Sequence, residues 1–174
     1  MSDGAISQDE IDALLAGVDM GGFSSSSSSS NDSVNIDTAT IEKFVGDLSD
    51  SLKNNLGTMT GATFGVGKPV VEVVDRDGEL KKVPEMVVSI VSDFNTALVG
   101  EHIYILSPDF TQKITGLVNN EPNPELDDMA LSVISEVVSS HTGTEITQLS
   151  QGGKLPGLAS NPADANHAPK AMVR

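Results

Sequence analysis

Two long stretches of the chain carry apolar residues at the spacing of an amphipathic helix. The first begins at Thr38, and the second runs from about Pro124 to Ser150. Steps of three and four residues place side chains on one helix face, so each stretch predicts a helix with one side turned toward a core. The apolar residues of the first are Ile41, Val45, Leu48, Leu52, Leu56 and Met59, and those of the second are Leu126, Met129, Ala130, Val133, Ile134, Val137 and Val138.

A shorter helix is signalled between these two. Ser107 followed by Pro108 has the form of an N-cap and a first helical residue, so we expect a helix over Asp109 to Val118. Asn123 before Pro124 repeats this signal at the start of the second long helix.

Runs rich in β-branched residues predict three strands before the short helix. They span Val70 to Val74, Met86 to Val91 and about Ala97 to Leu106, with a turn at Asp75 to Gly78. After Gly152 the chain is rich in Gly, Pro, Ala and Asn without periodicity, which is typical of a linker or disordered tail. With three strands and helices mainly on one side, we expect an open sheet edge, so that the chain self-associates, binds a partner chain or is less stable than a longer chain. Marginal stability with self-association is favoured, because this last segment has few apolar residues to cover the sheet.

The composition limits the kinds of molecule that the chain is expected to bind. The formal charge is -15, which disfavours binding to nucleic acid or an anionic membrane surface and favours a basic protein partner. There is no apolar run long enough to span a membrane and no secretory signal, so we expect a cytoplasmic protein without membrane insertion. The chain has no cysteine, and its three histidines, His102, His141 and His167, lack the spacing of paired metal ligands. Neither a metal site nor a cofactor is expected.

The amino-terminal region differs from the rest of the chain. Residues 1–37 contain seven acidic side chains and no Lys or Arg, and Gly21 and Gly22 lead into the serine run from Ser24 to Ser30. Such a segment has too little apolar area to form a core, so residues 21–37 are predicted to be a disordered, flexible tether.

The residues before the tether have the signals of a short helix. Ser7 and Glu10 form a capping box, and Ile6 with Ile11 forms a hydrophobic staple around it. Leu14 and Leu15 extend the apolar stripe that Ile11 begins. A helix of about ten residues is marginal alone in water, so residues 1–20 are predicted to fold on a partner; the alternative is that they pack on the chain's own domain.

The segment SQDEIDALLAG, residues 7–17, resembles the amino-terminal motif of the flagellar motor switch proteins FliM and FliY, which binds the phosphorylated response regulator CheY. The resemblance implies a regulator-binding peptide whose apolar side chains enter a groove of CheY and whose acidic side chains meet its basic residues. The residues carried over are Ile6, Ser7, Gln8, Asp9, Glu10, Ile11, Asp12, Leu14 and Leu15.

Residues 38–151 resemble part of a CheC-type domain, the fold shared by the phosphatases CheC and CheX and the middle regions of FliM and FliY. This implies an α+β fold in which helices pack on a small antiparallel sheet, followed by a tail or linker over residues 152–174. The phosphatases carry a Glu, an Asn three residues later and a Gly four beyond that on each active helix. Here Glu136, Ser139 and Gly143 occupy this frame, followed by Thr147 and Ser150.

The frame is incomplete, because Ser139 cannot present the oxygen and nitrogen of an amide together. No acid in the first helix is followed by Asn three residues later. Glu136 is therefore a weak catalytic candidate, and the alternative is an ordinary exposed glutamate.

The favoured function is a flagellar switch component at the cytoplasmic side of the basal body, with CheY and other switch-ring proteins as partners. The alternatives are a CheY phosphatase of the FliY or CheC type, and a generic acidic adaptor unrelated to flagella. The chain is expected to be a fragment or a reduced relative, because a second set of strands and a ring-assembly domain have no counterpart in it.

Overall fold

The computed structural model describes residues 36–151, 153 and 155–174. The predicted regulator-binding peptide, and the tether up to residue 35, lie outside these. The chain divides into two units, Met1–Asp47 with Gly67–Val73, and Leu48–Val66 with Val74–Arg174. The described elements are helices and short antiparallel strands, so the predicted α+β class is confirmed.

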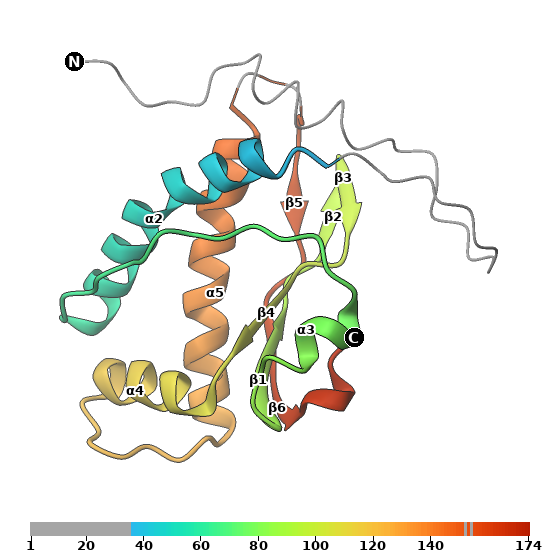
Figure 1. Cartoon of the computed structure of the whole chain (residues 1–174). Helices are drawn as coiled ribbons and strands as arrows, with labels where there is room; N and C mark the ends of the chain where they lie inside the picture. The colour runs from blue at the N-terminus through green and yellow to red at the C-terminus, as the bar shows by residue number, and fades with distance from the viewer. Residues whose placement is uncertain (1–35, 152, 154) are drawn as a thin grey trace. The chain divides into compact units, whose positions relative to one another are not determined.

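Two small antiparallel sheets lie in the second unit. In the first, β1 (Met86–Val91) is the central strand, between β4 (Ile103–Leu106) and β6 (Asp164–Pro169), as Figure 1 shows. In the second, β2 (Phe94–Thr96) is central, between β3 (Leu98–Gly100) and β5 (Ala159–Ser160).

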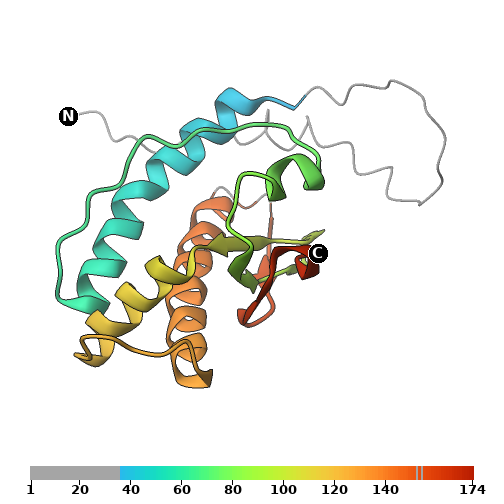
Figure 2. The same cartoon turned by 60° about the horizontal axis from the view of Figure 1, so that its bottom comes forward.

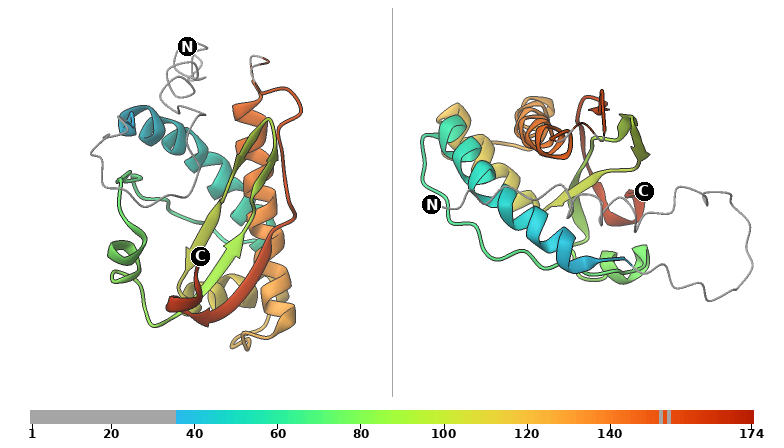
Figure 3. Two further views of the ribbon diagram at one scale, coloured as in Figure 1. Left: turned by 90° about the vertical axis from the view of Figure 1, so that its right-hand side faces the viewer. Right: turned by 90° about the horizontal axis from the view of Figure 1, so that it is seen from above.

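The three predicted helices are all present, two from the apolar stripes and one from the capping signal at Ser107. They are α2 (Thr38–Thr60), α4 (Pro108–Asn119) and α5 (Asp128–Leu149). Ser107 caps α4 as expected, since its hydroxyl accepts the amide of Phe110 at 3.2 Å. Figure 2 shows α4 beside α5, and in Figure 3 α5 runs along one face of the sheet of β4, β1 and β6.

The core of the second unit lies between this sheet and the helices. It is aliphatic, as the composition indicates, and Ile90 and Ile134 at its centre are both fully buried. The buried side chains of this cluster are Leu56, Val88, Ile90, Ile114, Ile134, Val137 and Val138.

The expected start of the second long helix is wrong. Helix α5 begins at Asp128, because the carboxylate of Asp127 accepts the amide of Ala130 at 2.9 Å and caps the helix. The carbonyl of Pro124 instead accepts the side-chain amide of Gln112 at 3.1 Å, which holds Pro124 in the preceding loop. Asn123 is therefore not an N-cap.

Two strand predictions need correction. The run from Val70 to Val74 forms no strand: no described strand pairs with it, and Val70 is 79% exposed. β-branched residues favour a strand only where a neighbour satisfies their backbone groups. The sequence predicted a single strand over Ala97 to Leu106, but the structure has two strands there, β3 and β4. β3 pairs with β2 and β4 pairs with β1. Strand β2 was not predicted.

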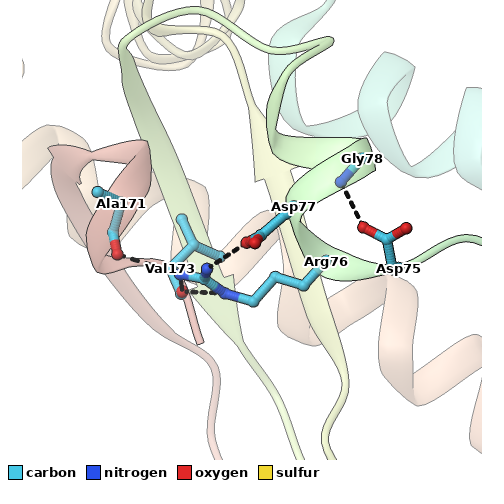
Figure 4. A network of polar contacts seen from close by, with 6 residues as sticks. All are labelled: Asp75, Arg76, Asp77, Gly78, Ala171 and Val173. Atoms are coloured by element: carbon cyan, nitrogen blue, oxygen red, sulfur yellow. Dashed lines mark hydrogen bonds and ion pairs between the residues drawn. The ribbon is translucent and has the colours of Figure 1, made fainter.

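The segments expected to be a turn and a tail form regular structure and contact each other. The turn is α3 (Arg76–Leu80), capped by Asp75, and the tail contains β5, β6 and the short 3-10 helix η1 (Lys170–Met172). The guanidinium of Arg76 donates to the carbonyls of Ala171 and Val173 (Figure 4).

The end of the chain also covers the second face of the sheet. Val173 packs with Leu80 and Val87, and all three side chains are buried. The expectation that the last segment cannot cover a sheet is therefore wrong, whereas marginal stability and self-association stay predictions.

Candidate functional site

The residues of the phosphatase-like frame lie on the outward side of α5. Glu136 is exposed and, within the described part of the chain, its side chain has no hydrogen bond or ion pair. The hydroxyl of Ser139 accepts the amide of Ala163 at 3.4 Å, and the hydroxyl of Thr147 donates to the carbonyl of Gly143 at 2.8 Å. Ser139 thus joins α5 to the segment before β6.

The structure brings α2 and α5 together near this frame without forming an acid–amide pair. The side-chain amide of Asn55 on α2 donates to the hydroxyl of Thr144 on α5 at 3.4 Å. This amide is half-buried and engaged in a contact between helices. In the described residues, neither helix therefore presents the Glu and Asn that the resemblance links to phosphatase activity.

A buried polar cluster lies on the other side of α5. Glu136 and Glu145 are nine residues apart, or two and a half helical turns at 3.6 residues per turn, so they point in roughly opposite directions. The side chain of Glu145 is only 12% exposed. We define the clasp cluster as His102, Tyr104, His141 and Glu145.

Tyr104 and His141 make the shortest contacts to the Glu145 carboxylate. The phenol of Tyr104, on β4, donates to Oε2 at 3.0 Å and lies 3.2 Å from the hydroxyl of Thr142. Nε2 of His141, one turn before Glu145 on α5, is 3.3 Å from Oε1. One carboxylate thus joins α5 to β4.

His102 closes the cluster from the loop before β4. Its Nε2 lies 3.7 Å from Oε2 of Glu145. Its ring stacks on Phe94 of β2, with centroids 5.0 Å apart, and contacts Tyr104 at 4.6 Å. His102 therefore links the cluster to the second sheet.

Burial changes the proton affinities of the cluster. It raises the pKa of Glu145 to about 6, against a partly offsetting hydrogen bond from Tyr104. Burial also raises the pKa of Tyr104. The pKa of His102 is lowered by burial despite the charge of Asp93, and that of His141 is lowered by burial and by His102. Low-dielectric surroundings disfavour the charged form of each group, which is the common cause.

Sequence reasoning missed this cluster. His102 and His141 are far apart in the sequence, and only the fold of β4 onto α5 brings them to the same carboxylate. The one local signal was the spacing of His141 and Glu145, four residues apart on a predicted helix. Across the described ranges, no three His, Asp or Glu side chains are arranged to hold a metal ion.

The fold is similar to that of a solved structure. No protein-family model matches the chain, and no curated protein matches its sequence significantly. Among solved structures, the crystal structure of FliY from Thermotoga maritima matches with a TM-score of 0.67 and 17% sequence identity, covering 78% of this chain and 70% of that one. The chain has the fold of FliY. The fold implied by the CheC-type resemblance is thus confirmed.

None of the helices in the described part of the chain is both long and apolar enough to cross a bilayer.

Proposed function

We propose that this chain is a flagellar motor switch component that binds the phosphorylated response regulator CheY through residues 1–20. The observation that carries the proposal is the motif SQDEIDALLAG at residues 7–17, and the FliY fold of the following residues supports it. The protein acts at the cytoplasmic side of the flagellar basal body, where other switch-ring proteins are its further partners.

The mechanism is capture by a peptide that folds on its partner. Ser7 and Glu10 define the helix start, so that Ile11, Leu14 and Leu15 form one apolar stripe. The stripe enters a groove of the regulator, and Asp9, Glu10 and Asp12 meet basic residues around it. The charge of -15 on the chain speeds association with a basic surface and makes it sensitive to salt.

Replacing Leu14 and Leu15 together by Ala tests the groove contact. Each buried leucine contributes roughly 1.5 to 3 kcal/mol, and each 1.4 kcal/mol is about tenfold in affinity. We therefore expect a loss of at least about a hundredfold in binding to phosphorylated CheY, measured by calorimetry. The control is Phe23→Ala, an apolar change outside the motif, which leaves the affinity unchanged. Equal affinity of the double variant and the unmodified chain would refute the contact.

The rival function, CheY phosphatase activity, is tested separately. Because Ser139 replaces the amide and the amide of Asn55 is engaged by Thr144, we expect phosphate release from CheY no faster than its own decay. Glu136→Ala should leave that rate unchanged. Faster release that Glu136→Ala abolishes would establish the enzyme instead.

A further inference from the structure

The clasp cluster is the main polar contact between α5 and β4. The hydroxyl of Tyr104 on β4 contacts Glu145 and Thr142 in the C-terminal half of α5, so these hydrogen bonds hold the two elements together. His141, also on α5, contacts the same carboxylate. The proposed binding of CheY uses none of these residues. Buried titratable groups without a role in binding are unusual enough to require an explanation.

The buried, unpartnered Nδ1 atoms of the two rings indicate the protonation state of the cluster. A neutral imidazole that donates from Nε2 toward Glu145 keeps a bare lone pair on Nδ1. In both His102 and His141, Nδ1 is buried and has no hydrogen-bond partner. A protonated ring would place an N–H at that buried position with no acceptor, which is costly. The closed cluster therefore fits neutral rings around one carboxylate.

The charged groups around the cluster give neither buried Nδ1 a hydrogen-bond partner. Asp93, between β1 and β2, accepts the backbone amide of His102 at 3.0 Å through Oδ1. Its other oxygen lies 3.9 Å from the guanidinium of Arg174. The contact from α2 to this part of α5 is the uncharged pair of Asn55 and Thr144. The charge of Asp93 thus acts to raise the pKa of His102, but burial outweighs it and the pKa is lowered.

We propose that His102, Tyr104, His141 and Glu145 form a proton-operated clasp that holds the C-terminal half of α5 on β4 at neutral pH and releases it on mild acidification.

The steps of release follow from counting donors and acceptors. A proton on Glu145 converts one of its oxygens from an acceptor into a donor, so the carboxyl retains one good acceptor for Tyr104 and His141. A proton on either ring adds a charged buried donor that has no acceptor. The closed arrangement then loses its advantage, and α5 separates from β4 from about His141 onward.

The chain supplies its own probe for this motion. Tyr104 is the single tyrosine and there is no tryptophan, so tyrosine fluorescence reports on the clasp alone. The experiment follows Tyr104 emission of the full chain from about pH 8 to about pH 5, the range in which imidazoles titrate. Far-UV circular dichroism, recorded on the same samples, reports on unfolding of the whole domain.

We expect Tyr104 emission to change at or below about pH 6, the pKa of Glu145, while the circular dichroism signal is retained. Glu145→Gln cannot take up the proton that Glu145 binds, so its Tyr104 emission at neutral pH differs and its transition moves by a measurable shift in midpoint. Glu101→Gln is the control, because it removes a carboxylate next to His102 but outside the cluster, and it keeps the transition of the unmodified chain.

His141→Gln provides a second variant if Glu145→Gln does not fold, and its transition should also shift in midpoint. The clasp is refuted if Tyr104 emission stays constant until the circular dichroism signal is lost. It is equally refuted if the folded Glu145→Gln or His141→Gln protein has the same transition as the unmodified chain.

Discussion

At the scale of single residues, two buried histidines make the stability of the fold depend on pH. Burial lowers the pKa of His102 and His141 below 6.5, their ordinary value. As the pH falls through 6.5, the unfolded chain binds protons at both rings before the folded chain does, so stability is lost. Glu145 acts in the opposite direction, because its folded pKa of about 6 exceeds its ordinary 4.5 and the folded chain binds that proton first.

At about pH 5.5 both rings are mostly protonated in the unfolded chain, whereas Glu145 has contributed only part of its effect. We therefore predict a free energy of unfolding that is lower at about pH 5.5 than at about pH 7.5. Urea denaturation at the two pH values measures the difference. In the double variant His102→Gln and His141→Gln, the loss on acidification should largely disappear or reverse. An unchanged difference in the double variant would show that other groups set the pH dependence.

Core residues could be predicted from spacing, but polar residues of the cluster could not. Ile134 and Val138 were placed on the apolar stripe and are buried. Met129 was placed on the same stripe but is 65% exposed, since it lies in the first turn of a helix that begins later than expected. His102 and His141 are joined only by tertiary structure, which no local pattern encodes.

At the scale of elements, substitutions can identify the residue that caps the start of α5. Asp127 caps the helix through the amide of Ala130, whereas Asn123, the cap expected from the sequence, is exposed in the loop. Asp127→Ala should therefore destabilise the chain by about 1 kcal/mol, and Asn123→Ala should have little effect. Thermal or urea denaturation of the two variants checks this, and equal losses would mean that Asp127 is not the dominant cap.

Helices were more predictable than strands for a physical reason. A helix such as α4 satisfies its backbone within one segment, and its cap Ser107 is a local signal. A strand depends on partners that are distant in the chain: β6, with the sequence DANHAP, has little strand propensity but pairs along the full length of β1. The run from Val70 to Val74 has the propensity, but no described strand pairs with it, so it forms no strand.

At the scale of the whole molecule, the proposed capture of CheY and the folded framework belong to different parts of the chain. The FliY fold supplies a framework, while the proposed capture of CheY depends on a short motif in residues 1–20, outside the described residues. The exposed frame around Glu136 and the buried clasp cluster lie on opposite sides of α5, so changes to one can be made without altering the other.

The central claim is that residues 1–20 recognise CheY in its phosphorylated state. Calorimetry of the full chain against CheY, with and without a small phosphate donor, tests this most directly. We predict tighter binding to phosphorylated CheY, a difference that is lost when residues 1–20 are deleted. Equal affinity for the two forms, or a difference that survives the deletion, would contradict the account.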